Sequence, residues 1–184
     1  MRLLVPALLA GLVLAGAWWL APAGAEGPTM SAIAAGDTPG GFALNDQDGK
    51  AVRLGHGKDH GWFVLAFYPK ASTGGCTREV CSLRDSEEGF RTRKVARYGI
   101  SLDDVAAQKV FHSAQKLDFA LLSDPDGSVA RRSRVLPEGA GWPQRVTFIV
   151  DPQGVVRHVD RSVAVGTHGA DLLPVLDRLL AEAR

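Results

Sequence analysis

The sequence shows almost no bias of charge. It contains 21 lysines and arginines against 20 aspartates and glutamates, which gives 184 residues a formal net charge of +1. Nucleic-acid-binding domains usually carry a marked basic patch. The one basic run, RTRKVAR at 91–97, is equally typical of a solvated surface. The composition therefore gives no reason to expect a nucleic-acid partner.

Metal-ligand spacings and internal repeats are also missing. The histidines are His56, His60, His112, His158 and His168. None of them stands in a ligand spacing with the two cysteines, whereas zinc sites usually show short, regular cysteine and histidine spacings. We therefore expect no metal and no cofactor. A chain of this length with 46% hydrophobic residues suits one domain.

An apolar run with a single charge occupies the N-terminus. Arg2 precedes apolar residues from Leu3 to Leu20, and Ala23-Gly24-Ala25 follows them. This pattern is typical of a cleavable secretory signal. We expect 1–25 to be a signal peptide, or a membrane anchor if it stays uncleaved, because the run is long enough to span a bilayer.

The segment that follows is rich in alanine, glycine and serine, so we expect 26–36 to be a linker and 37–184 to be the folded domain. The signal predicts an exported protein, periplasmic or otherwise extracytoplasmic, in a compartment where disulfides can persist. Contact with a membrane is expected only if the N-terminal segment is uncleaved.

Strand and helix signals alternate along the domain. Two short strands flank an Asp48-Gly49 turn within 41–54, and the unbroken apolar run 61–68 predicts a strand buried on both faces. The other expected elements are a helix to about 91, a strand at 94–101 with a helix after it, a strand at 119–127, a short helix at 128–136, a hairpin at 145–159 and a closing helix at 170–184 with Pro174 in its first turn.

The helix after 94–101 has the clearest pattern. Ser101 and Asp104 are expected to form its capping box. Apolar residues at helical spacing predict its buried face. They are Leu102, Val105, Ala106, Val110, Phe111 and Ala114.

Alternating strands and helices around a buried central strand predict an α/β domain. We expect a central mixed β-sheet flanked by helices, with an N-terminal β-hairpin extension. A hairpin before a C-terminal helix is typical of the second half of a thioredoxin-like fold.

Both cysteines of the chain lie in one short segment, FYPKASTGGCTREVCSLRD at 67–85. Cys76 follows the buried strand through a Gly-Gly turn, at the carboxyl-end side of the sheet where such folds place their ligands. The amino end of the next helix favours an anion and therefore a thiolate. Cys76 is a candidate nucleophile on location alone, while a structural disulfide, a metal clip and a redox pair stay open.

These residues resemble the peroxiredoxins. Pro69, Thr73 and Cys76 match the family signature Pro-x-x-x-Thr-x-x-Cys. Cys81 matches the resolving cysteine of the Q-type, or bacterioferritin-comigratory, subgroup. The resemblance extends from about residue 35 to the C-terminus.

Two more residues and one departure belong to this resemblance. Glu79 and Arg145 fall on positions that look like family active-site residues. Gly74 stands where the subgroup usually has proline, which leaves the loop less preorganised.

The resemblance implies a thiol-dependent peroxidase for hydrogen peroxide and organic hydroperoxides. Cys76 would become a sulfenic acid, Cys81 would condense with it to a disulfide, and a thioredoxin-like reductant would restore both thiols. The protein would act as a monomer or weak dimer.

Peroxide cleavage needs a held nucleophile and polar groups at both oxygens. The hydroxyl of Thr73, the N–H groups of Gly75 and Cys76, and the guanidinium of Arg145 are expected to bind them. Pro69 is expected to shape the loop and to shield Cys76 from water.

Other functions fit the two cysteines less well. A structural disulfide closing so short a loop would restrain little of the chain. A thioredoxin-fold disulfide oxidoreductase normally has its cysteines two residues apart, and a copper-handling protein needs a histidine placed to join the thiolates. The spacing therefore favours the peroxidase.

Overall fold

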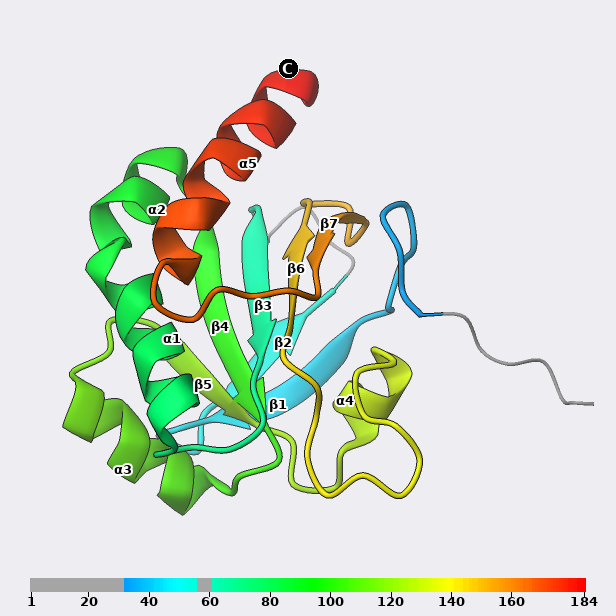
Figure 1. Cartoon of the computed structure of the whole chain (residues 1–184). Coiled ribbons are helices and arrows are strands. Elements are labelled where there is room, and N and C mark those ends of the chain that lie inside the picture. The colour runs from blue at the N-terminus through cyan, green and yellow to red at the C-terminus, as the bar shows by residue number, and fades with distance from the viewer. Residues whose placement is uncertain (1–31, 56–60) are drawn as a thin grey trace, which may run out of the picture.

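A mixed sheet of seven strands runs through the molecule, with helices on both faces (Figure 1). The computed structural model describes residues 32–55 and 61–184. The strands are β1 Phe42–Asp46, β2 Ala51–Leu54, β3 Phe63–Phe67, β4 Ala96–Ser101, β5 Ala120–Ser123, β6 Val146–Val150 and β7 Val156–Asp160. The helices are α1 Gly74–Asp85, α2 Glu87–Arg93, α3 Val105–Gln115, α4 Ser128–Arg132 and α5 His168–Glu182. This architecture confirms the mixed sheet flanked by helices.

The central strand is β3, whose residues are all buried. It pairs in parallel with β4 and antiparallel with β6, so the sheet order is β2-β1-β5-β4-β3-β6-β7. A strand covered on both faces must be apolar without alternation. The expectation of a doubly buried strand at this place is confirmed.

Each face of the sheet has its own hydrophobic core. Helices α1, α2, α3 and α5 cover one face, where Tyr68, Phe90 and Phe111 are fully buried, and α4 covers the other (Figure 1). Ile33 is 5% exposed within the second core, and Gly36 donates a hydrogen bond to the carbonyl of Val156. Packing therefore begins inside the segment expected as a linker. The expected signal peptide, and the linker up to residue 31, lie outside the described residues.

The expected N-terminal hairpin is present. Strands β1 and β2 pair antiparallel from Phe42 opposite Leu54 to Asn45 opposite Ala51. The turn between them is closed by the Gly49 N–H, which donates to the carbonyl of Asp46. Strand β1 also pairs with β5, so the hairpin extends the edge of the sheet.

The single helix expected to about residue 91 is two helices. Ser86 leaves the helical conformation, with φ −97° and ψ 13°, and it ends α1 and begins α2. Lys94, in the left-handed region, ends α2 before β4.

The expected capping box before α3 is wrong. Asp104 is the N-cap, and its carboxylate accepts a hydrogen bond from the Ala107 N–H at 2.8 Å. Ser101 instead ends β4, and its hydroxyl donates to the Asp103 carboxylate at 2.7 Å. The helix therefore begins later than expected, at Val105.

The expected buried face of α3 is only partly confirmed. Val110 is 66% exposed, while Phe111 and the polar Gln108 are buried. The Gln108 amide accepts from the hydroxyl of Tyr68 and donates to that of Ser101, so its burial leaves no polar atom unpaired. A hydrophobic pattern cannot detect a glutamine buried in this way.

Pro174 does not lie in the first turn of the last helix. Helix α5 begins at His168, earlier than expected, which places Pro174 in its interior. The early start follows from packing, because the N–H of Gly169 donates to the hydroxyl of Ser82 on α1.

Gly169 allows this close approach, since a Cβ there would lie 2.3 Å from the carbonyl oxygen of Ser82. We expect Gly169→Ala to lower the free energy of unfolding by about 1–3 kcal/mol, because neither backbone can yield freely. Urea denaturation measures the loss. Gly166→Ala is the matched control, since a Cβ there meets nothing within 4 Å. Equal stability of the two variants would contradict the tight contact.

Candidate active site

The loop after β3 leads directly into α1 and carries most of the expected site residues. Thr73 is extended, with φ −86° and ψ 151°, and is the N-cap of α1. Cys76 lies in the first turn of α1 and is 1% exposed. The first N–H groups of a helix have no intrahelical acceptor, so they point at this region. The sulfur is thus buried beside a helix amino end.

Asp103 supports this loop from the end of β4. Its carboxylate accepts hydrogen bonds from the Ala71 N–H at 2.8 Å and from the Ser101 hydroxyl at 2.7 Å. The hydroxyl of Thr73 donates to the carbonyl of Lys70 at 2.9 Å. Thr73 therefore does not direct its proton toward Cys76. Pro69 is half-buried in the same loop.

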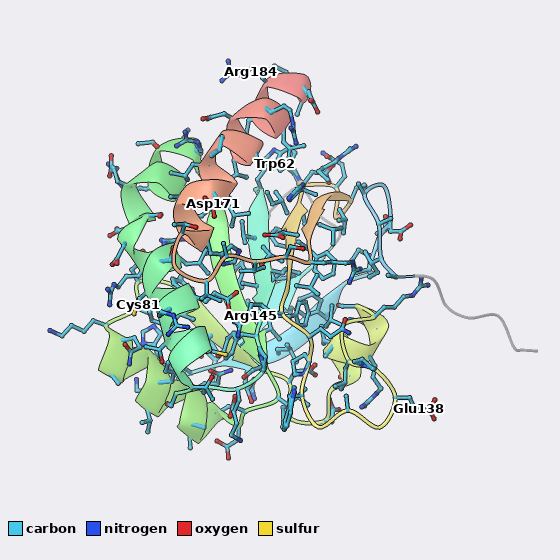
Figure 2. The ribbon with its side chains drawn as sticks, viewed as in Figure 1. Trp62, Cys81, Glu138, Arg145, Asp171 and Arg184 are labelled. Carbon is cyan, nitrogen blue, oxygen red and sulfur yellow. The ribbon has the colours of Figure 1, made fainter. Side chains whose placement is uncertain are left out.

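Arg145 approaches Cys76 from the segment just before β6. Its Nη2 lies 3.4 Å from the Cys76 Sγ, and its Nη1 donates to Oε2 of Glu79. A Cβ added to Gly75 would lie 3.4 Å from the same Nη2, so the guanidinium rests against the Gly75 backbone. Figure 2 shows Arg145 between α1 and the sheet. The fold thus brings Gly75, Cys76, Glu79 and Arg145 together.

Glu79 connects this group to two residues that sequence reasoning did not place in the site. The carboxylate is 0% exposed, and its Oε1 lies 3.4 Å from Nδ1 of His168, at the start of α5. The His168 Nε2 lies 3.0 Å from the hydroxyl oxygen of Thr147 on β6. Although they face each other, Oε1 and Nδ1 form no hydrogen bond of good geometry.

Burial dominates the electrostatics of this pair. It raises the pKa of Glu79 to about 7, against the opposing effect of Arg145. It lowers the pKa of His168 to about 4. His168 is therefore a neutral imidazole at neutral pH.

No local pattern could have identified His168 or Thr147. Each is distant in sequence from Glu79, and a search for metal spacing passes over a single histidine. Their contact arises only because α5 begins against α1, where Gly169 meets Ser82.

Cys81 lies farther along α1 and faces a different neighbour. Its Sγ lies 3.5 Å from Oε1 of Gln115 at the end of α3, and it is half-buried. Figure 2 shows Cys81 on the outer side of α1, away from Arg145. Both thiols are free. The fold therefore places the two cysteines in one helix but not in contact.

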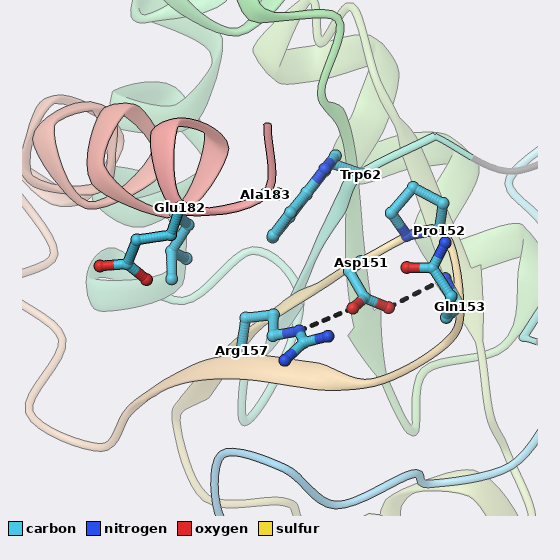
Figure 3. Close-up of a pocket in the computed structure, with 8 residues that line it drawn as sticks. Trp62, Asp151, Pro152, Gln153, Arg157, Glu182 and Ala183 are labelled. Atoms are coloured by element: carbon cyan, nitrogen blue, oxygen red, sulfur yellow. Dashed lines mark hydrogen bonds and ion pairs between the residues drawn. The ribbon is translucent and has the colours of Figure 1, made fainter.

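One cavity of the described surface lies apart from this group. A cavity of about 330 Å³ opens between the β6–β7 turn and the end of α5, beside Trp62 (Figure 3). The Nε of Arg157 lies 2.6 Å from Oδ2 of Asp151 there, so the central charges pair with each other. No thiol lines it. The candidate active site is thus the group around Cys76.

No three histidine, cysteine, aspartate or glutamate side chains gather as metal ligands within 32–55 and 61–184. His56 and His60 lie outside these residues.

Known proteins resemble this chain in sequence and in fold. Residues 35–159 match the model of the AhpC/TSA family. The chain belongs to this family. Chloroplastic peroxiredoxin Q of Triticum aestivum is 38% identical over 151 residues, which cover 79% of this chain and 69% of the relative. Chloroplastic peroxiredoxin Q of Suaeda salsa is 37% identical over 142 residues, which cover 76% of this chain and 65% of the relative.

Solved structures of the family agree with the fold. Peroxidoxin BcpB from Mycobacterium tuberculosis superposes with a TM-score of 0.72 at 36% identity, covering 79% of this chain and 97% of that one. The bacterioferritin comigratory protein of Xanthomonas campestris gives a TM-score of 0.69 at 29% identity, covering 75% and 91%. The expected thioredoxin-like fold is confirmed.

The family membership settles the type of chemistry. This AhpC/TSA chain is a peroxiredoxin of the Q type, a thiol peroxidase that uses peroxide and a thioredoxin-like reductant. Its two cysteines are consistent with an atypical two-cysteine cycle. The disulfide oxidoreductase and copper-handling alternatives are thereby set aside.

The expected periplasmic or extracytoplasmic location is wrong. The curated relatives are chloroplastic, which is a plastid location. No helix in the described part of the chain is long and apolar enough to cross a membrane. The expectation rested entirely on 1–25, which lie outside the described residues, and an apolar leader does not by itself specify a destination.

Proposed function

We propose that Cys76 is the thiol that attacks the peroxide and that Cys81 resolves the product. The observation that carries this assignment is the position of the Cys76 sulfur, buried at the start of α1 and 3.4 Å from Nη2 of Arg145. An anionic sulfur is stabilised by both the helix amino end and the guanidinium. Cys81 has neither neighbour.

The first step breaks the O–O bond. The Cys76 thiolate attacks one oxygen and forms an S–O bond, while the other oxygen leaves with the bonding electrons and takes up a proton as water or an alcohol. Cys76 is thereby oxidised to a sulfenic acid. In this proposal Arg145 and the N–H groups of Gly75 and Cys76 stabilise the charge on the departing oxygen.

Thr73 is assigned as an acceptor. A hydroperoxide carries an O–H of its own that needs a partner in a buried site. Because the Thr73 hydroxyl donates to the Lys70 carbonyl, the lone pairs of its oxygen stay available to that O–H. The oxygen that carries this hydrogen is thereby held beside Cys76, so the sulfur attacks that oxygen and the other one leaves. Pro69 contributes the shape of the loop.

The substrates proposed are hydrogen peroxide and alkyl hydroperoxides. Alkyl peroxide reduction is named for the structurally similar Xanthomonas campestris protein. The Cys76 end of the site binds only the two oxygens, which both substrate types share.

Resolution is proposed to occur within one chain. The Cys81 thiol attacks the sulfenic sulfur of Cys76, water leaves, and the disulfide is then reduced by the dithiol of a thioredoxin-like protein. Since both thiols belong to α1, no second subunit is required. We propose a monomer, or at most a weak dimer.

Disulfide formation requires α1 to change. Five steps along a regular helix separate the Cα atoms of Cys76 and Cys81 by about 8 to 9 Å. A disulfide joins Cα atoms about 4.4 to 6.8 Å apart. The segment from Cys76 to Cys81 must therefore unwind locally, and Gly74 and Gly75 can absorb the change in backbone direction.

Substitution of each cysteine separates the two roles. We expect Cys76→Ser to abolish peroxide-dependent NADPH oxidation coupled through thioredoxin and its reductase, with the fold intact. Cys81→Ser should react once and stall with Cys76 as sulfenic or further oxidised acid, seen by intact mass after a peroxide pulse. Substantial turnover by Cys76→Ser, or an unmodified Cys76 in Cys81→Ser, would refute the assignment.

Removal of Arg145 tests its contribution to O–O cleavage. We expect Arg145→Ala to slow oxidation of Cys76 by about 100-fold or more, as for loss of a transition-state donor. Arg145→Lys keeps the positive charge but lacks the two-pronged guanidinium, so its oxidation rate should lie between those of the parent and Arg145→Ala. Arg178→Ala, on the exposed side of α5, is the control. Stopped-flow rates for Arg145→Ala within a few fold of the parent would show that Arg145 is only structural.

Hydrogen exchange tests the local unwinding. Amides from about Thr77 to Leu83 should lose protection when the Cys76–Cys81 bond forms, because their helical acceptors are lost. Amides of β6 serve as the internal reference. Equal protection of the segment in both redox forms, with the bond verified by mass, would rule the mechanism out.

A further inference from the structure

Two buried polar atoms face each other next to the site without a hydrogen bond. They are Oε1 of Glu79 and Nδ1 of His168, 3.4 Å apart, on side chains that are 0% and 1% exposed. These are the unpartnered buried side-chain atoms found within residues 32–55 and 61–184. A buried polar atom left unpaired destabilises the folded protein, so such a pair requires an explanation.

The neighbours of the pair decide where the proton lies. The other oxygen of Glu79 is occupied by Arg145, and Nε2 of His168 lies 3.0 Å from the Thr147 hydroxyl. If that hydroxyl donates to Nε2, the proton of a neutral imidazole must sit on Nδ1. It then points at Oε1 of Glu79, and a small rotation of the ring completes the bond. Both ring nitrogens of His168 and both oxygens of Glu79 have a partner in this arrangement.

We infer that His168 is a positioning residue of the peroxidase site: its Nδ1–H donates to Oε1 of Glu79 and keeps that buried carboxylate ionised, so that Glu79 holds Arg145 beside Cys76. The inference rests on the role proposed for Arg145. His168 contacts neither the sulfur nor the peroxide, and it acts through Glu79.

Burial and the surrounding charges shift the pKa values of both Glu79 and His168. Burial raises the pKa of Glu79, Asp160 on β7 raises it further, and Arg145 lowers it. For His168, Asp160 and Asp171 favour the cation while burial and Arg145 oppose it, and burial prevails. A neutral donor at Oε1 stabilises the carboxylate without adding a buried charge, so it lowers the pKa of Glu79.

The charge on Glu79 matters for Arg145. A charge-assisted hydrogen bond is about twice as strong as a neutral one. A protonated Glu79 would hold the guanidinium weakly and would release it from the place where it contacts Cys76. Loss of the His168 donor should therefore appear as a loss of activity that grows as the pH falls.

The test measures the rate of Cys76 oxidation by hydrogen peroxide from pH 6 to 8.5. Without His168, the pKa of Glu79 rises, and the carboxylate is lost as the pH falls through that raised value. We expect His168→Leu to match the parent within about threefold at pH 8.5 and to fall about tenfold or more below it at pH 6. His112→Leu, on α3, is the matched control.

Two substitutions distinguish the ring nitrogens. The amide nitrogen of His168→Asn lies near the position of Nδ1 and should restore the rate at pH 6 to within about threefold. His168→Gln places its amide near Nε2 and should not restore it. Rescue by Gln and not by Asn would overturn the inference.

Repeating the measurement in a Glu79→Gln variant distinguishes a positioning role of His168 from general structural damage. Glu79→Gln cannot ionise, so in that background His168→Leu should change the rate by the same factor at every pH. A loss from His168→Leu that is independent of pH in both backgrounds would overturn the inference. If Arg145→Ala still slows oxidation, the proposed function stands while this inference falls.

Direct titration covers the case in which His168→Leu does not fold. The carbon-13 shift of the Glu79 carboxyl should give a lower pKa in the parent and in His168→Asn than in His168→Gln. Equal Glu79 pKa values in the parent and in His168→Gln would overturn the inference.

Discussion

The buried ion pair between Glu79 and Arg145 is the interaction on which the site depends. It joins α1, which carries both cysteines, to the start of β6, and it determines where the guanidinium lies relative to the Cys76 sulfur. A fully buried carboxylate is costly unless its oxygens are paired. The helix start, the sulfur and the cation are thus held together by one carboxyl group.

The proposed resolution step would give α1 two arrangements that exclude each other. Glu79 lies between Cys76 and Cys81, so the proposed unwinding would also move Glu79 relative to Arg145 and His168. In the wound helix Glu79 is paired with Arg145 and the two thiols are separate. In the proposed unwound form a disulfide joins the sulfurs, and reduction by the thioredoxin-like partner would remove that bond.

The parts of this architecture that could be predicted from sequence are those encoded locally. The unbroken apolar run of β3, the Asp48-Gly49 hairpin and the position of Cys76 at a helix start all follow from neighbouring residues, although Gly74 and Gly75 belong to α1 and do not form the expected turn before it. The face of α3 could not be predicted, because Gln108 is buried through partners on other elements, and Val110 is exposed despite its composition. The position of Pro174 inside α5 could not be predicted either, because the start of α5 is set by its contact with α1.

The residues of the candidate site likewise fall into those that a local motif indicates and those that only the fold brings together. Thr73, Gly75, Cys76, Glu79 and Cys81 lie in one continuous segment, so the family signature and the positions next to it point to all of them. His168 and Thr147 become neighbours of Glu79 only when β6 and α5 pack against α1, and neither has a local pattern that distinguishes it from a core or surface residue. A buried acid at a motif position nevertheless raises a question that sequence alone can pose: which group satisfies its second oxygen. In this fold the group that faces that oxygen is the imidazole of His168, in the first turn of the last helix, which lies between the carboxylate and the hydroxyl of Thr147.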